Sequence, residues 1–361
     1  MANKKNSEIL NQITGNSSQQ YQDMVMLADD LGDVQAIYET LEGYPTLKNE
    51  FLNTFVNKVI KSVYYNKLFN NPLKMLHKGK LEFGSSVEQL YVNRAKKYNF
   101  DEHFDGSNSD EGDLIKSEKA KVYARYISKN FAYKYKVTIS EQQLKTAFFN
   151  EYGLHQLVNN IVNSLVDASE QDEFLDMKKI IINLVEAGVD VNGVAISKQV
   201  SDIELKAPYE HKVAPTSTSI AKALKAMAGR LSFKSDKYNM AGVLQHSQKQ
   251  DLVFLTTPEI SAGLDVDVIA NAFNVSAVDA NIRIIEVDEL PTRVCKTVGT
   301  LGEEKNVLGV LFEKDLLQCY DTVLENRTFD NGAKMETNIF LHKQGLMENC
   351  LYCNMVVFTA E

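Results

Sequence analysis

Cys350 and Cys353 have a spacing that suits metal or redox chemistry. The stretch Cys350-Leu-Tyr-Cys353 could supply half of a zinc site, or a dithiol pair. The sequence contains no second CxxC stretch and no HxxxH stretch that would complete a zinc site. The apolar residues around the pair indicate a strand, in which residues three apart face opposite sides. We therefore expect two separate buried cysteines, without a metal.

Other candidate motifs are weaker. Asp265 and Asp267 could bridge a metal, but no third hard ligand lies nearby in sequence, so we expect them to flank an apolar segment. The stretch from Gly299 to Gly302 lacks the GK[ST] of a phosphate-binding loop and is expected to be an ordinary loop. The histidines lie outside HExxH and GxSxG patterns: His77, His103, His155, His211, His246 and His342. The sequence thus predicts no catalytic residue, no cofactor site and no metal site.

Basic residues gather in one part of the chain and could suggest a nucleic-acid patch. Glu82 and Glu88 interleave with them, and an acidic stretch follows. A solvated charged face or an inter-subunit contact is therefore the better interpretation. The basic residues are Lys74, Lys78, Lys80, Arg94, Lys96 and Lys97.

These residues fall in a segment, Asn70 to Ser140, that is expected to form one long protruding β-hairpin. The return limb, Lys121 to Ser140, is rich in Tyr, Val, Ile and Phe, which favour strands. Between the limbs, Asp101 to Asp113 has six carboxylates and no Lys or Arg, which is typical of a solvated loop. Because an isolated two-stranded ribbon is marginally stable in water, this arm is expected to lie on another molecule.

Composition excludes several classes. With 361 residues, 44% of them hydrophobic, the chain can form one large domain or a few ordinary ones. A net charge of −9 argues against a general nucleic-acid binder. The sequence contains neither an apolar run of about 18 residues nor an apolar signal-peptide core, so we expect a soluble, cytosolic product without a membrane segment. Its 4 cysteines are too few for a disulfide scaffold.

The remaining elements alternate in type. Residues 1 to 20 are polar and expected to be disordered, followed by helices from Tyr21 to Thr40 and from Leu47 to Phe69. A long amphipathic helix is predicted from Gly153 to Gly188, with Gly188 at its C-terminal cap. A compact α/β domain should follow. The last two apolar stretches, from Met335, are expected to form a strand pair that returns to the long helix.

Particular segments accompany this order of elements. They are Asn70-Asn71-Pro72-Leu73-Lys74, Gly79-Lys80-Leu81 with Gly84, Val87-Glu88-Gln89-Leu90-Tyr91, Leu144-Lys145-Thr146-Ala147-Phe148, Asp172-Glu173-Phe174, and Leu264 to Asn274. None of the segments is catalytic, and their joint order and spacing are more specific than any one alone. Together they resemble the Hong Kong 97-type capsid fold, and more closely the major capsid proteins of small protein-primed podoviruses. The resemblance covers residues about 45 to 361.

The resemblance implies an α+β fold with named parts. Residues 1–72 would be the N-terminal arm, 73–138 the E-loop, 139–204 the P-domain with its spine helix, 205–330 the α/β A-domain, and 331–361 the return strands of the P-domain. Some relatives carry an additional immunoglobulin-like domain at the C-terminus. This chain ends three residues after Phe358, so a plainer outer surface is expected.

The implied function is mechanical and not enzymatic. The chain would assemble into pentamers and hexamers of a closed tailed-phage head, in the virion, after synthesis in the host cytoplasm. Expected partners are a portal protein, packaged double-stranded DNA in non-specific proximity and, because only about 70 residues precede the hairpin, a separate scaffolding protein. An encapsulin-like shell around enzyme cargo is the nearest alternative, and a soluble α/β enzyme or thiol-redox protein is a more distant one.

Overall fold

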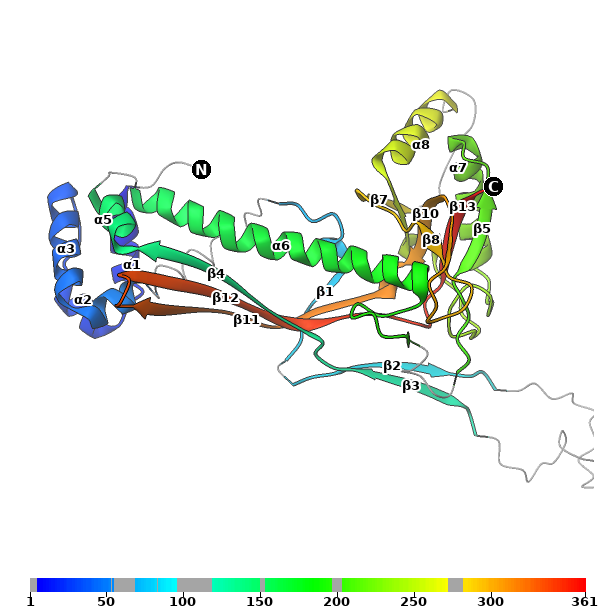
Figure 1. The fold of residues 1–361 in the computed structure, drawn as a ribbon, viewed down its shortest axis with the longest axis horizontal. Coiled ribbons are helices and arrows are strands. Elements are labelled where there is room, and N and C mark those ends of the chain that lie inside the picture. The colour runs from blue at the N-terminus through cyan, green and yellow to red at the C-terminus, as the bar shows by residue number, and fades with distance from the viewer. Residues whose placement is uncertain are drawn as a thin grey trace, which may run out of the picture.

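A computed structural model describes residues 5–52, 54, 69–82, 84–95, 119–149, 153–196, 203–271 and 282–361. Its long axis is marked by one helix, α6, which runs beside an elongated sheet (Figure 1). The N-terminal helices lie at one end of this unit, and a second sheet lies at the other end. None of the described helices is long and apolar enough to cross a membrane.

The helical elements are α1 (Asn6–Thr14), α2 (Gln19–Met24), α3 (Leu31–Gly43), η1 (Lys74–Leu76), α5 (Glu141–Phe149), α6 (Gly153–Ala187), α7 (Ser217–Leu231), η3 (Lys249–Asp251), α8 (Pro258–Asn271) and η4 (Lys314–Leu316). The strands are β1 (His77–Lys80), β2 (Val87–Val92), β3 (Val122–Ile127), β4 (Phe131–Ser140), β5 (Tyr209–Val213), β6 (Leu252–Thr256), β7 (Arg283–Glu286), β8 (Arg293–Val294), β9 (Glu303–Glu304), β10 (Val307–Glu313), β11 (Leu317–Asn331), β12 (Glu336–Asn349) and β13 (Met355–Ala360).

The N-terminal region is more ordered than the sequence suggested. The prediction of disorder over residues 1 to 20 is wrong for α1, because Leu10 and Ile13 are buried against the first half of α6 and its neighbours. The single helix predicted from Tyr21 to Thr40 is divided into α2 and α3. Asp30 begins α3 with a capping box that it forms with Asp33, which explains the break. A further helix begins at residue 45; its predicted continuation to Phe69 lies outside the described residues.

The long helix is confirmed as α6. Its first half packs in the N-terminal cluster and its second half in a separate cluster at the other end of the molecule. Gly188 follows α6 at φ +62°, a conformation that glycine adopts without strain, and its N–H donates to the carbonyl of Leu184 at 3.1 Å.

The sheet along α6 has the strand order β1-β11-β12-β4. Strand β12 pairs antiparallel with both β11 and β4, while β1 pairs parallel with β11. The single long hairpin predicted from Asn70 to Ser140 is therefore wrong at both ends. Within the described part of this segment, only β2 and β3 pair as a ribbon, because β1 and β4 gain more backbone hydrogen bonds and burial within the larger sheet.

The second sheet has the order β5-β13-β10-β6-β7 and is covered by α7 and α8 (Figure 1). Every residue of β6 is buried, as expected for a strand with both faces covered. The prediction that both C-terminal strands return to the long helix holds for β12 but is wrong for β13. The apolar stretch from Met355 to Phe358 fits between β5 and β10, where both faces of the sheet are dry. Strand β11, which the proposed A-domain included, instead pairs in the sheet along α6.

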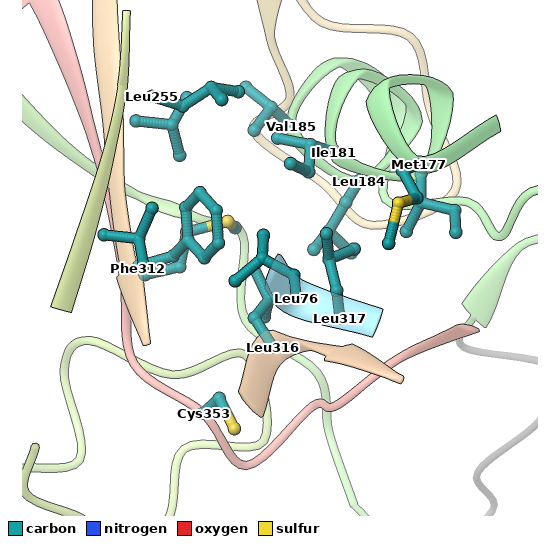
Figure 2. Close-up of a cluster of buried hydrophobic side chains, with 14 of the residues drawn as sticks. Leu76, Met177, Ile181, Leu184, Val185, Leu255, Phe312, Leu316, Leu317 and Cys353 are labelled. Carbon is teal, nitrogen blue, oxygen red and sulfur yellow. The ribbon is translucent and has the colours of Figure 1, made fainter. Parts of the chain in front are cut away.

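The two sheets meet under the second half of α6. Figure 2 shows Met177, Ile181 and Leu184 of the helix directed toward Leu316 and Leu317, which connect β10 to β11. Phe312 and Leu255, from the second sheet, complete this cluster. The molecule therefore has one continuous core at the junction, on which both sheets and the start of the arm depend.

Candidate assembly surface

The β2–β3 ribbon leaves the body beside the sheet junction (Figure 1). Its two faces differ in burial. Its six cross-strand pairs run from Val87↔Ile127 to Val92↔Val122. Side chains alternate between the faces of a strand, so one face carries Gln89, Tyr91 and Arg125 and the other carries the residues between them.

The inner face is fixed to the end of β12 by polar contacts. Arg125 is buried, and its Nη1 donates to the carbonyl oxygen of Asn349 at 2.9 Å and to the side-chain Oδ1 of the same residue at 3.2 Å. Gln89 Nε2 donates to the same carbonyl at 3.1 Å. Glu348 lies 3.5 Å from Arg125 and is itself buried.

Aromatic stacking continues this attachment. The ring of Tyr91 stacks on that of Tyr352, with 5.8 Å between the ring centroids and an interplanar angle of 24°. It also stacks on the ring of Tyr123, with 6.4 Å between the centroids and an angle of 23°. Its hydroxyl donates to the carbonyl of Leu244 at 3.2 Å. The expectation that the arm lies on another molecule is therefore wrong for this inner face, which packs on the end of β12 and the following turn of the same chain.

The outer face is apolar and open. Leu90, Val92, Val122 and Tyr126 are 55%, 54%, 56% and 68% exposed, and Ala124 lies opposite Leu90. Tyr126 donates to Glu88 across the strands at 2.6 Å, which joins the two side chains on the outer face. Apolar side chains at consecutive outward positions of both strands form a contiguous patch, which is typical of a surface that another protein covers.

The root of the arm is held by a buried charge cluster under α6. Glu173 on α6 has a fully buried side chain and contacts Lys343 of β12 and Lys74 of η1, the latter at 2.7 Å. Glu170 lies 3.1 Å from Lys74. One carboxylate thus joins the helix, the sheet and the start of the arm, so these three elements have a fixed relative position.

The pKa shifts of the buried carboxyls differ between the root of the arm, at Glu173, and the ribbon's seat, which is the end of β12 around Glu348 and Asn349. Burial opposes ionisation of Glu173, but Lys343 and Lys74 outweigh it and lower the pKa of this carboxyl. At the seat, burial raises the pKa of Glu348, and the Arg125 guanidinium offsets this only in part. The root is therefore a well-compensated ion cluster, while the seat holds a carboxyl that is costly to ionise.

The structure corrects one motif argument. Cys350 and Cys353 lie in the turn between β12 and β13 and not in a strand, so they do not face opposite sides. The interaction between the two side chains lowers the pKa of Cys350 and raises that of Cys353. The strand interpretation failed because the apolar run continues across the turn, where Leu351 and Tyr352 are buried outside any ladder. In the described part of the chain, no group of three or more His, Cys, Asp or Glu residues could hold a metal.

The glycine stretch from Gly299 to Gly302 is a loop, as predicted, and it has a structural role. Gly299 N–H donates to the carbonyl of Ala187 at 2.7 Å, and Gly302 N–H donates to that of Glu186 at 2.8 Å. The loop thereby satisfies carbonyls at the end of α6 that have no partner within the helix. A Cβ at Gly302 would lie 2.1 Å from the carbonyl oxygen of Val294, so glycine is required there.

The other candidate residues are scattered. His77 lies 3.3 Å from Asp321 near the root, whereas His211 packs edge-on against Phe358 and His246 is exposed. Lys78 pairs with Asp315, which supports a charged face rather than a nucleic-acid patch. The side chains of His155, Asp265 and Asp267, and the residues His103, Lys96, Lys97 and Asp101 to Asp113, lie outside the described residues.

Sequence reasoning missed the inward role of Arg125 and Gln89. The sequence did contain an indication of this role. In the alternating patterns of VEQLYV and VYARYI, Gln89 and Arg125 each lie on the strand face opposite that of their immediate neighbours. A polar residue in the buried phase of a strand needs a partner, and Asn349 supplies it here.

Comparison with solved structures defines the class of the protein. A chain in the capsid structure of Staphylococcus phage Andhra superposes with a TM-score of 0.55 at 15% sequence identity, over 82% of this chain and 86% of that one. The long helix beside an elongated sheet, the two-stranded arm and the separate α/β unit are those of the Hong Kong 97-type capsid fold. The protein thus belongs to the class of chains with this fold.

The sequence comparison is more specific. The profile of the Phi29-like phage major capsid protein family matches residues 10–359, and the chain belongs to that family. It is 26% identical to the major capsid protein of Bacillus phage GA-1 over 314 residues, which span 87% of this chain and 61% of that protein. It is 25% identical to the major capsid protein of Bacillus phage PZA over 98% of this chain and 72% of that one.

Proposed function

We propose that this chain is the repeating subunit of a tailed-phage head and that the outer face of the β2–β3 ribbon is a contact with a second copy. The observation that carries the proposal is the asymmetry of the ribbon. Its inner face is anchored to the chain's own β12 and turn, while its outer face leaves four large apolar side chains open. A surface of this kind supports association because covering it removes apolar area from water.

The fixed root supports the same conclusion. A ribbon that moved freely would lose conformational entropy when it bound a neighbour. The contacts of Glu173 with Lys74 and of Arg125 with Asn349 hold it in place before association. The ribbon is therefore pre-organised as a rigid attachment, and repeated attachment of identical copies in rings can close a shell.

The parts of the fold retain their proposed roles with altered boundaries. We assign β11 and β12 to the long-helix unit, or P-domain, and β13 to the five-stranded A-domain, because the strand pairing groups them in this way. The β2–β3 ribbon belongs to the E-loop, and the N-terminal helices form the N-terminal arm. None of these parts is assigned a catalytic residue, a metal or a cofactor.

Partners and location follow from shell assembly. We propose pentamers and hexamers of this chain in the virion, assembled in the host cytoplasm, with a portal protein and a separate scaffolding protein. A net charge of −9 fits a lining past which packaged double-stranded DNA can move without binding tightly. The family match favours this function over an encapsulin-like shell or a soluble enzyme.

The test removes the apolar character of the outer face. Leu90→Ser, Val122→Ser and Tyr126→Ser are combined, and assembly is followed by light scattering and negative-stain microscopy. We expect soluble, folded protein with its helical circular dichroism unchanged and with shell formation lost.

Ala124→Ser is the matched control, because it places the same side chain on the same face and removes almost no apolar area. This control should assemble like the unaltered chain. If the triple variant closes shells as efficiently as the control, the outer face is not the contact.

A further inference from the structure

The turn that joins β12 to β13 places two thiols together. Leu351 and Tyr352 form the middle of this turn, with Cys350 and Cys353 at its ends. The first and fourth residues of a turn lie within about 7 Å, and disulfides join Cα atoms about 4.4–6.8 Å apart. The backbone is thus close to the geometry that an intramolecular disulfide requires.

Both flanks of the turn are fixed. The N–H of Cys350 donates to the carbonyl of Leu316 at 2.7 Å, and the N–H of Ala241 donates to that of Leu351 at 3.2 Å. Asn354 forms a bridge with Asn239 directly after the turn. The backbone on both sides of the two cysteines is therefore fixed by the fold.

The two thiols have unequal environments. Hydrogen bonding from the Cys353 side chain is the main reason that the pKa of Cys350 is lowered, although burial opposes the shift. The same bond, together with burial, raises the pKa of Cys353. Cys350 is also partly exposed, whereas Cys353 is only 8% exposed. Cys350 therefore has the environment of an attacking thiolate, and Cys353 that of a thiol that acts second.

We propose that Cys350 and Cys353 form a redox-active dithiol that a low-molecular-weight disulfide oxidises to an intramolecular disulfide. Cys350 thiolate attacks one sulfur of the oxidant, forming a mixed disulfide and releasing one thiolate. Cys353 then loses its proton and attacks the Cys350 sulfur, and the second thiol leaves. Two electrons and two protons pass to the oxidant, which is reduced to two thiols.

The reaction has internal controls. Cys295 and Cys319 are only 2% and 1% exposed, and burial raises the pKa of both. Neither is adjacent to another cysteine in sequence, and both are free. An oxidant that reached cysteines indiscriminately would modify these two as well, whereas the proposed mechanism leaves them as thiols.

The experiment treats the reduced full-length chain with oxidised glutathione, followed by alkylation, trypsin digestion and mass spectrometry. Cleavage after Lys343 leaves Cys350 and Cys353 in one C-terminal peptide, separate from those of Cys295 and Cys319. We expect this peptide to lose the mass of two hydrogen atoms and to carry no alkyl group, with Cys295 and Cys319 fully alkylated. A thiol titration under denaturing conditions should fall from four thiols to two.

Single variants separate the two roles. Cys353→Ser should stop at the mixed disulfide and retain one glutathione on Cys350. In the Cys350→Ser variant, the remaining Cys353 thiol should react with oxidised glutathione at least about tenfold more slowly, because little of it is present as thiolate. Four free thiols in the unaltered chain after prolonged oxidation would overturn the proposal, as would equal glutathione addition to both positions without an internal disulfide.

Discussion

The five-stranded sheet and the β2–β3 ribbon are built from similar residues but depend on different surroundings. Strand β6 is buried at every position, and β13 is buried at all but its last. The ribbon has equally strand-favouring residues, yet one of its faces remains in water. The first region completes its packing within one chain, while the second needs a further surface to bury its apolar side chains.

This difference separates stability from assembly. Substitutions in the sheet should lower the free energy of unfolding, because they create cavities or unpaired groups. Substitutions on the outer face of the ribbon should leave that free energy nearly unchanged and act on association.

The largest effect is expected for Phe358→Ala in β13. Phe358 is fully buried, and its ring contacts those of Phe254 and His211 edge-on, each at 5.6 Å. Removing the ring should cost about 3–5 kcal/mol of unfolding free energy, measured by urea denaturation. Phe329→Ala is the control, since Phe329 is 62% exposed, and it should change stability by less than about 0.5 kcal/mol. Equal effects at the two positions would contradict the comparison.

A smaller but still large effect is expected for Glu173→Gln at the root of the arm. The change leaves Lys343, which is 4% exposed at its side chain, without its main counter-charge. Breaking such a cluster should cost about 3 kcal/mol at neutral pH. The lowered pKa of Glu173 means that its contribution is present above the ordinary glutamate pKa and is lost as the pH falls through the folded value.

The Glu173 prediction is measured as the difference in unfolding free energy between the two proteins across the acid range. This difference should shrink as the pH falls. Glu325→Gln is the control, because Glu325 pairs with Arg327 in solvent, and its effect should be below about 1 kcal/mol. A difference that is independent of pH would refute the role of the ionised Glu173 carboxylate.

Arg125→Met should open the ribbon locally without unfolding the sheets. It removes two hydrogen bonds to Asn349 and leaves Glu348 buried without its nearest cation. We expect protection of the β2 and β3 amides against hydrogen exchange to fall by about 1–3 kcal/mol, with β6 and β10 unchanged. Arg327→Met, on the exposed face of β11, is the control. Loss of protection throughout the chain would show that the ribbon is part of the global fold.

The smallest effect is expected for Glu348→Gln, and its sign reverses that of Glu173→Gln. Because burial raises the pKa of Glu348, the folded chain favours the protonated form, and stability decreases as the pH rises from the ordinary glutamate pKa to the folded value. Glutamine does not ionise, so the unfolding free energy of the variant relative to that of the unaltered chain should increase as the pH rises through this interval. Urea denaturation at a series of pH values measures this difference. An increase as the pH falls would contradict a raised pKa of Glu348.

Sequence patterns predicted the elements whose residues repeat regularly. The apolar spacing from Gly153 onward predicted the full length of α6, and Gly188 was correctly expected to end it. The α/β region predicted after the long helix is also present and includes the strands β6 and β10 and the helix α7. The failures lie at chain reversals. The apolar stretch through Cys350 and Cys353 contains a buried turn, and pattern alone does not distinguish a buried turn from a strand, because both exclude water.

The sequence by itself determined the helical and strand periodicities, the acidic balance and the order of elements that identifies the capsid fold. Only the tertiary structure decided which strands pair. It placed β13 in the five-stranded sheet, β4 beside β12, and one face of the ribbon on the turn at Tyr352. The physical reason is that side-chain alternation fixes which residues share a face, whereas the partner of that face is fixed by contacts between residues far apart in the chain. The contact of Arg125 with Asn349, across 224 positions, is one such case.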